Sequence, residues 1–188
     1  MARAAPPKRV KFFVGMLSAD TGLLDRAAKH VARAFGPVDL ISNTWPFDFT
    51  DYYTAEMGPD LKRRFVAVAE LARPDRLADL KRQANELETR ICDECGQAHE
   101  FRPVNLDPGY LTLAGLFLAS MKNYAHRVYL GRGVYAEVTL LFERGRWQTL
   151  PWTYPDYATE HYQEFFSLLR DRYKEQLAAP QPAPPEDE

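Results

Sequence analysis

The stretch from residue 103 to residue 157 constrains the fold more than any other part of this chain. Within it, Val134–Glu143 alternates apolar and polar side chains, which predicts a half-buried β-strand because successive side chains of a strand point to opposite faces. His126–Gly131 precedes this run and Trp147–Leu150 follows it, each separated from it by a glycine-containing turn. The three segments together predict a β-meander.

Two shorter features precede the meander. Asn105–Gly109 contains Asp-Pro-Gly, in which proline presets φ and glycine tolerates positive φ, so we expect a tight turn there. Tyr110–Lys122 is apolar, and its length favours a helix over a strand. Gly115 lowers the helix propensity of that segment by about 1 kcal/mol relative to alanine.

The part of the chain before this stretch alternates between strand and helix patterns. Compact apolar runs predict strands at Arg9–Leu17, Val38–Phe47 and Leu61–Leu71. Apolar residues at helical spacing predict one helix from Ser18 or Asp20 to Gly36, and a second from Pro74 through Arg90. A last helix follows the meander, with an apolar stripe from Tyr162 to Leu177.

This order of elements predicts an α+β fold: a largely antiparallel sheet of five to seven strands, with three or four helices packed mainly on one face. The opening β-α-β-β-α order also matches the start of a ferredoxin-like fold. Hydrophobic residues make up 46% of the chain, enough for the core of one globular domain over residues 9–177. Residues 1–8 and the Pro-rich, acidic residues 178–188 are expected to be disordered, and residues 92–102 to form a loop insertion.

Charge and motif content argue against several classes of protein. The formal net charge is −2, so no basic field favours bulk nucleic-acid binding. No apolar run approaches the roughly 20 residues needed to span a bilayer, and the N-terminus lacks a long apolar signal segment, so we expect a cytoplasmic protein without a membrane partner. The sequence contains neither a glycine-rich phosphate loop nor the G-x-G-x-x-G, H-E-x-x-H or G-x-S-x-G motifs.

Cys92, Cys95 and His99 form the one metal-like spacing in the chain. A structural zinc site needs four ligands, and no second C-x-x-C motif follows, so a fourth ligand would have to come from elsewhere or from a second chain. The alternatives are a pair of reduced thiols in a loop and a redox disulfide that lacks a thioredoxin-like context. Zinc is thus a candidate cofactor at this segment.

The polar face of the predicted meander is the main candidate site. If the polar sides of its neighbouring strands coincide, they form one surface made of Arg127, Tyr129, Tyr135, Glu137 and Thr139. Lys122 and His126 then lie at the entrance of this surface. The alternative is a solvated sheet face with cross-strand arginine–glutamate and tyrosine pairs.

A surface of this kind suits a small anion. Arginine offers planar, forked donors to a carboxylate or phosphate, so we expect Arg127 to hold the anion together with Lys62 or Arg64. His126 can move a proton near neutral pH, and Glu137 can act as a base or hold a cation. These two are therefore the candidate catalytic residues.

Two aromatic segments could contribute to the same site. The loop 47–60 is rich in aromatic and acidic residues, and Asp48, Asp51 and Glu56 could bind Mg²⁺ or Ca²⁺ or simply cover a sheet edge. The segment PWTYPDY, residues 151–157, is expected to form a rigid lid because its two prolines restrict the backbone. Asp156 is the residue of this segment that packing explains least, which makes it a candidate ligand-binding residue.

Several long motifs carry a resemblance to a known family. FDFTDYYTAEMG, LKRRFV, VNLDPGYLTLA, KNYAHRVYLGRGVYAEVTLLF and PWTYPDY resemble an uncharacterised bacterial family, a domain of unknown function. The resemblance runs from Lys11 to Leu177 and implies a bacterial cytoplasmic protein, but it implies no reaction. CDECGQAHEF departs from the family pattern, in which this segment is shorter and lacks cysteines, so a metal role for it does not extend to the family.

Two hypotheses of function follow from these patterns. In the first, the protein binds a small anionic or phosphorylated metabolite or nucleotide, with or without catalysis. In the second, it is a non-catalytic interaction module, for example a homodimer, whose aromatic loop and PWTYPDY segment form the interface. A structure that scatters the polar side chains over separate surfaces would argue against the first hypothesis.

Overall fold

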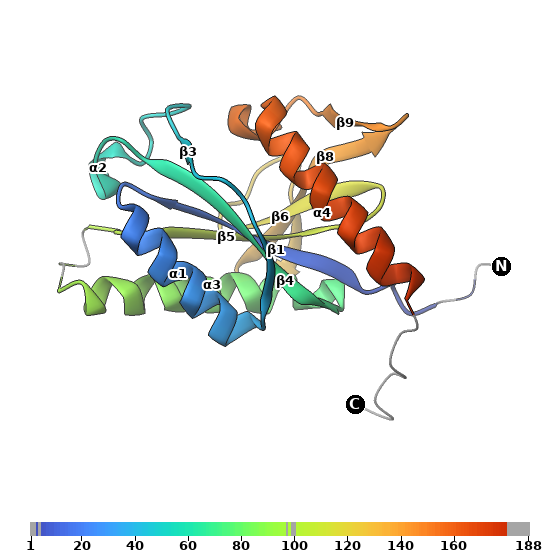
Figure 1. The fold of residues 1–188 in the computed structure, drawn as a ribbon, viewed down its shortest axis with the longest axis horizontal. Helices are drawn as coiled ribbons and strands as arrows, with labels where there is room; N and C mark the ends of the chain where they lie inside the picture. The colour runs from blue at the N-terminus through green and yellow to red at the C-terminus, as the bar shows by residue number, and fades with distance from the viewer. Residues whose placement is uncertain (1–2, 4, 97, 99–100, 180–188) are drawn as a thin grey trace.

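A computed structural model describes residues 3, 5–96, 98 and 101–179 (Figure 1). His99 and parts of the segments 1–8 and 178–188, for which we predicted a zinc ligand and disorder, lie outside these residues. The described residues form one sheet of nine strands, and every pairing in it is antiparallel. The α+β class is therefore confirmed. No helix in this part of the chain has the length and apolar composition that crossing a bilayer requires.

The first half of the described chain is a ferredoxin-like unit. Its elements are β1 (Val10–Ser18), α1 (Thr21–Phe35), β2 (Val38–Ile41), β4 (Lys62–Ala72), α3 (Leu77–Glu94) and β5 (Asn105–Leu111). The strands lie in the order β2-β4-β1-β5, with the first strand in the middle and the two crossover helices between sequential strands. The β-α-β-β-α order predicted for the opening of the sequence is present, and β5, which was not predicted as a strand, completes the ferredoxin-like arrangement. Between β2 and β4, the chain adds the two-residue strand β3 (Trp45–Pro46) beside β4 and the short helix α2 (Thr54–Met57).

The second half extends the same sheet beyond β5. Its strands are β6 (Gly115–Ser120), β7 (Val128–Gly131), β8 (Val134–Glu143) and β9 (Arg146–Thr149). The long strand β8 pairs with β6 along one edge, while β7 and β9 pair with its two ends along the other edge. The three strands predicted for the meander are all present.

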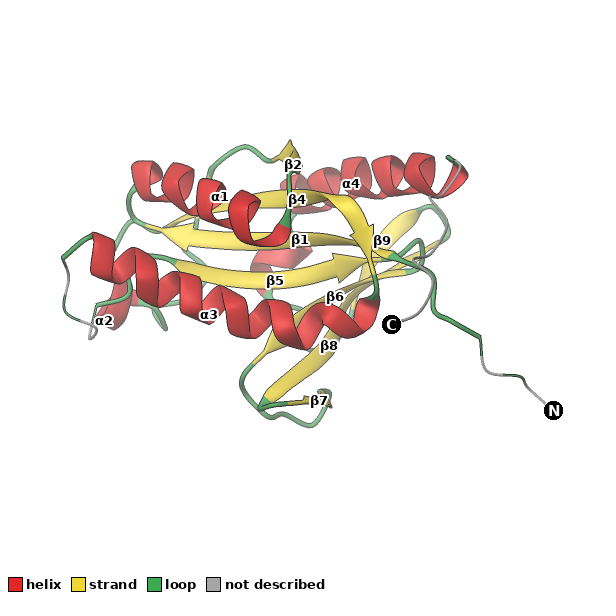
Figure 2. Ribbon diagram, turned by 90° about the horizontal axis from the view of Figure 1, so that it is seen from below, coloured by secondary structure: helices red, strands yellow, loops and turns green. Residues whose placement is uncertain are grey.

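Helices cover both faces of the sheet (Figure 2). Helices α1 and α3 pack on one face. Their apolar side chains form a core there with Val14 and Met16 of β1. Helix α4 (Glu160–Ala178) packs on the other face, where the Phe13 ring lies 5.2 Å, centre to centre, from the Phe166 ring of that helix. Because β1 is buried on both faces, its sequence is a continuous apolar run instead of an alternating one.

The predicted turn at Asn105–Gly109 is wrong, because these residues belong to β5. Pro108 is accommodated there because its nitrogen faces the edge of β5 that has no partner strand at that position. Gly109 is required for close approach: a Cβ atom at this position would overlap the Phe117 carbonyl oxygen and lie 2.7 Å from the Phe13 ring.

The predicted helix at Tyr110–Lys122 is also wrong. The segment completes β5, turns, and continues as β6, which pairs with β5 on one side and with β8 on the other. Pairing with β8, which follows later in the sequence, overrides the local helix propensity of this apolar segment. Elsewhere the predicted strand Val38–Phe47 divides into β2 and β3, and α3 extends to Glu94, so Cys92 belongs to a helix and not to a loop.

Candidate functional site

A cavity of about 840 Å³ opens where β5 and β6 separate. The two strands pair only over Gly109–Leu111 and Leu116–Leu118. Beyond these pairs, β5 keeps only β1 as a neighbour and β6 keeps only β8. Side chains from β4, β5, β6, α3 and the segment 47–53 line the resulting space.

Polar side chains of α3 replace the missing strand along the cavity edge of β5. The Leu106 N–H donates to the Glu88 carboxylate at 2.6 Å, and the Leu106 carbonyl accepts from Lys81 Nζ at 2.9 Å. Pro108, the next residue with its nitrogen on this edge, has no N–H to satisfy. The edge of β5 is thus saturated without a strand, which leaves room for the cavity.

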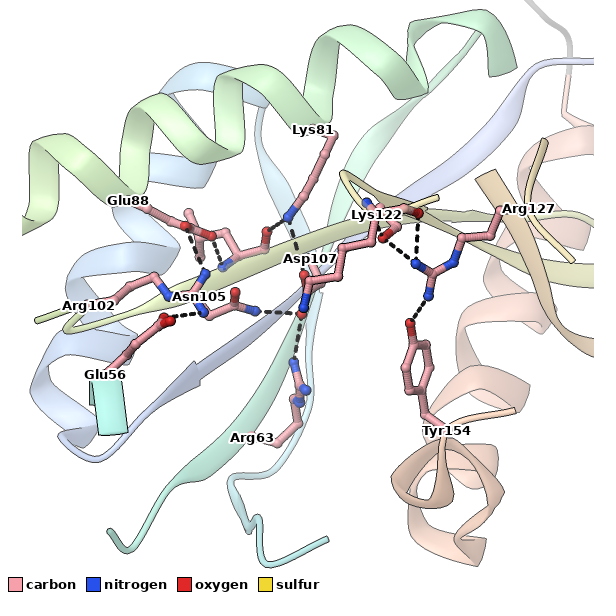
Figure 3. A network of polar contacts seen from close by, with 12 residues as sticks. Glu56, Arg63, Lys81, Glu88, Arg102, Asn105, Asp107, Lys122, Arg127 and Tyr154 are labelled. Carbon is pink, nitrogen blue, oxygen red and sulfur yellow. Dashed lines mark hydrogen bonds and ion pairs between the residues drawn. The ribbon is translucent and has the colours of Figure 1, made fainter. Parts of the chain in front are cut away.

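Asp107 lies at the centre of the cavity wall (Figure 3). Its carboxylate accepts from Asn105 Nδ2 at 2.6 Å and from Lys81 Nζ at 3.3 Å, and it lies 3.5 Å from Arg63 Nη1. Burial opposes ionisation of this carboxyl group, but the charges of Lys81 and Arg63 outweigh burial and hold its pKa below the ordinary value. Asp107 is therefore ionised at neutral pH.

Arg63 lies under the cavity floor with only 3% of its surface exposed. Its Nη2 atom lies 3.5 Å from Asp156, and its guanidinium covers the Phe47 ring at 5.0 Å from the ring centre. Within the described residues, its Nε and Nη1 atoms have no hydrogen-bond partner. Burial raises the pKa of Asp156 although Arg63 opposes the rise. Arg63 is thus paired with two carboxylates, Asp107 and Asp156, but part of its hydrogen-bonding capacity is unused.

Arg127 and Lys122 form one end of the cavity. Arg127 donates to Glu137 at 2.7 Å, to Ser120 Oγ and the Lys122 carbonyl at 2.9 Å, and to the Tyr154 hydroxyl at 2.7 Å. Burial, together with the Glu137 charge, raises the pKa of Tyr154 to about 12, so its hydroxyl stays protonated. The guanidinium of Arg127 is therefore held rigidly by four partners.

The ammonium group of Lys122 has a different environment. It donates to the Tyr52 hydroxyl and lies 4.0 Å from the centre of the Tyr52 ring. Among the described residues, it makes no ion pair with a carboxylate. The contact with Tyr52 also ties the aromatic segment 47–53 to the end of β6.

Arg102 forms the opposite end of the cavity (Figure 3). It pairs with Glu56 at 3.1 Å and with Glu88 at 3.7 Å, and it lies over the Tyr53 ring. Burial raises the pKa of Glu88, against the opposing effect of Lys81 and of the Leu106 N–H. This end therefore carries acids that balance its one arginine, in contrast to the Lys122 end.

A family model described as a domain of unknown function (DUF4416) matches residues 8–173, which include the whole sheet and most of α4. The chain belongs to this family. The resemblance inferred from FDFTDYY, VNLDPGYLTLA and PWTYPDY is thereby confirmed. The chain matches no curated protein and no solved structure. Every residue that lines the cavity lies within the DUF4416 match.

The structure brings together some of the predicted site residues of this DUF4416 chain. Lys122, Arg127 and Asp156 line the cavity. Glu137 is 3% exposed and lies behind Arg127, where it also accepts a 3.1 Å contact from His126. His126 in turn stacks on Trp152 with ring centres 4.9 Å apart. Neither candidate catalytic residue is among the side chains that line the cavity.

Other predicted residues lie away from the cavity. Lys62 and Arg64 point to the α1 face of the sheet, where Lys62 donates to the Ala19 carbonyl at 2.7 Å and Arg64 pairs with Asp25. Tyr129, which is 59% exposed, packs against Tyr135 beside the cavity end of the sheet and not inside it.

The predicted metal ligands do not assemble in the part of the chain that the structure describes. No group of three or more His, Cys, Asp and Glu side chains there is arranged to hold a metal ion. Cys92 is buried in α3, and its Sγ lies 3.4 Å from the Phe101 carbonyl, while Cys95 lies 3.7 Å from Arg26 Nη1. In the acidic loop, Glu56 is engaged by Arg102.

The sequence reasoning missed five charged residues of the cavity, namely Arg63, Lys81, Glu88, Arg102 and Asp107. One signal for two of them was present. Lys81 and Glu88 lie seven residues apart beside the apolar stripe of α3, so both fall on the face that packs on the sheet. Charged residues on such a face need buried partners, which points to a polar site beneath the helix.

The lowered pKa of Asp107 predicts a specific pH dependence of stability. A carboxyl group whose pKa is lower in the folded state stabilises the fold at pH values above its unfolded-state pKa of 3.8. This stabilisation disappears as the pH falls toward the lower pKa of the folded state. The stability difference between wild type and Asp107→Asn, measured by urea unfolding, should be largest at neutral pH and should shrink below pH 3.8. A difference that is constant across this range would contradict the assignment. Glu88 and Asp156 have raised pKa values, so their contributions to stability change with pH in the opposite direction to that of Asp107. Both residues are present in wild type and in the variant.

Proposed function

We propose that the protein binds a small anionic ligand, a phosphorylated metabolite or a nucleotide, in the cavity between β5 and β6. The observation that carries this proposal is Arg63. A buried guanidinium with unused N–H groups is costly, and an anion in the cavity would supply hydrogen-bond acceptors for these groups. The cavity volume lies in the range of small-molecule sites.

The charge balance of the cavity wall supports the same conclusion. The side chains that line it are five cationic and three acidic ones, an excess of two positive charges within the wall: Arg63, Lys81, Arg102, Lys122 and Arg127 against Glu88, Asp107 and Asp156. Two further acids, Glu56 and Glu137, pair with Arg102 and Arg127 from outside the wall. The chain as a whole has a net charge of −2, so this excess is local. Charges that face a partly dehydrated space act more strongly on a ligand than the same charges on an open surface.

Lys122→Met offers a clean test of anion binding. Lys122 is exposed and pairs with no described carboxylate, so its removal strands no buried charge. We expect wild type to bind inorganic pyrophosphate in calorimetric titrations, and Lys122→Met to bind it about tenfold more weakly, as befits the loss of one charge-assisted contact.

The matched control is Lys174→Met, an exposed lysine near the C-terminal end of α4, the end of that helix far from Asp156, which should leave the affinity unchanged. Equal losses in the two variants would mean that pyrophosphate responds to net charge and not to the cavity. Failure of wild type to bind both the simple anions (pyrophosphate, phosphate and citrate) and nucleotides would remove the proposal altogether.

A further inference from the structure

The two ends of the cavity differ in charge, and this difference restricts the ligand. At one end, Lys122 and Arg127 face a single acid, Glu137, which lies behind Arg127. At the other end, Arg102 faces two acids, Glu56 and Glu88. The cavity is thus positive at one end and rich in hydrogen-bond acceptors at the other.

The acceptor-rich end also offers neutral polar groups. Asn85 and Thr89 of α3 line it together with Asn105 of β5. Such amide and hydroxyl groups recognise the donor and acceptor pattern of an uncharged polar ring, whereas a second phosphate would meet the Glu88 carboxyl group.

The two ends are too far apart for a single phosphate to reach both. The polar side chains of α3 that line the cavity begin at Lys81 and end at Thr89, and eight residues of helix span about 12 Å. Aromatic side chains line the cavity along its length: Tyr53 beside Arg102, Phe47 beside Arg63, Tyr52 beside Lys122 and Tyr154 beside Arg127. A ligand that fills the cavity therefore has an apolar or flat body between an anionic group and a polar head.

We propose that the ligand is a nucleoside monophosphate, with its phosphate at Lys122 and Arg127 and its base beside Asn85 and Asn105. This rests on the proposed function and names the ligand class for the same cavity. The phosphate would contact Lys122, the one cation of the described cavity wall that has no carboxylate partner. It would also contact the Nη2 group of Arg127 beside the Tyr154 hydroxyl. The base meets neutral donors and acceptors at the end where an anion is disfavoured.

The test compares four probes on the purified full-length chain by calorimetry: adenosine monophosphate, guanosine monophosphate, ribose 5-phosphate and adenosine. We expect at least one nucleotide to bind about tenfold more tightly than either ribose 5-phosphate or adenosine, because each half of the ligand adds contacts. Lys122→Met should lower nucleotide affinity toward that of adenosine. Asn85→Ala, at a half-buried helix position, should lower it toward that of ribose 5-phosphate.

The outcomes separate this inference from the proposed function. If ribose 5-phosphate binds as tightly as both nucleotides, the base has no site and the nucleotide assignment is overturned, while anion binding stands. If pyrophosphate binds but no nucleotide does, the assignment fails in the same way. If neither nucleotides nor simple anions bind, both proposals fail. Thermal unfolding of each variant establishes that a loss of affinity is not a loss of fold.

Discussion

Arg63→Met is expected to lose about 3–5 kcal/mol of unfolding free energy, the range for removing one partner of a buried ion pair. Arg63 and Asp156 have side chains that are only 4% and 5% exposed, and Asp107 depends on the same guanidinium. Without Arg63, Asp156 is left as a buried carboxyl group with no cation beside it. Urea unfolding monitored by circular dichroism measures the loss.

Three comparisons make this expectation specific. Arg63→Lys keeps the charge but not the forked donor geometry, so it should lose less. Arg63→Met combined with Asp156→Asn removes the uncompensated acid and should recover part of the loss. The loss in Arg63→Met should also shrink in mild acid, because the pKa of Asp156 rises further without Arg63 and protonation then removes the buried charge. A single variant within about 1 kcal/mol of wild type would show that Arg63 does not neutralise these acids.

Gly109→Ala is expected to destabilise the protein by about 3 kcal/mol, at the upper end of the range for overpacking. The added methyl group would overlap the Phe117 carbonyl oxygen and approach the Phe13 ring to 2.7 Å and the Leu118 side chain to 2.8 Å. The overlapping atom belongs to the backbone of β6, so relief requires the two strands to move apart. In a strand with free space, the same change would stabilise the protein by about 0.4–1 kcal/mol through the unfolded chain, so the sign of the effect is diagnostic.

Gly145→Ala is the matched control for this prediction. Gly145 has φ of 80°, and no described atom lies within 4 Å of the position that a Cβ atom would take, so alanine there suffers only from its backbone conformation. We expect a loss of about 1–2 kcal/mol from that cause. A Gly109→Ala variant no less stable than Gly145→Ala would mean that β5 and β6 are not in close contact at this point. Chemical unfolding of both variants under one condition provides the comparison.

Local patterns were sufficient for most of the ferredoxin-like half. The continuous apolar run at Arg9–Leu17, the Asp20 cap and the Gly36 stop each act within a few residues, and the structure places β1 and α1 there. Local patterns failed where contacts with residues distant in the sequence determine the secondary structure. Asp107-Pro108-Gly109 is turn chemistry by itself, yet contact with β1 on one side and α3 on the other makes it a strand with a saturated edge. Such pairings become visible only once the order of the strands is known.

The site was predictable in kind but not in every residue. Lys62 or Arg64 was expected to hold the anion, but it is Arg63, the residue between them, that faces the cavity. Successive side chains of β4 point to opposite faces, so Arg63 points to the cavity and Lys62 and Arg64 point to the α1 face. The three basic residues alone do not indicate which of the two faces carries the cavity. Arg127 and Lys122 were found because the alternation of Val134–Glu143 anchors the neighbouring strand. Whether these cations hold a ligand stays a prediction.

The short pairing between β5 and β6 makes this a composite site. Arg63, Lys81 and Asp107 come from the ferredoxin-like half, whereas Lys122 and Arg127 come from the extension that begins at β6. A fragment that ended before β6 would retain the sheet order β2-β4-β1-β5 but only the central and acid-balanced portion of the cavity wall. The proposed ligand site is therefore formed by both substructures together and would be incomplete in either one alone.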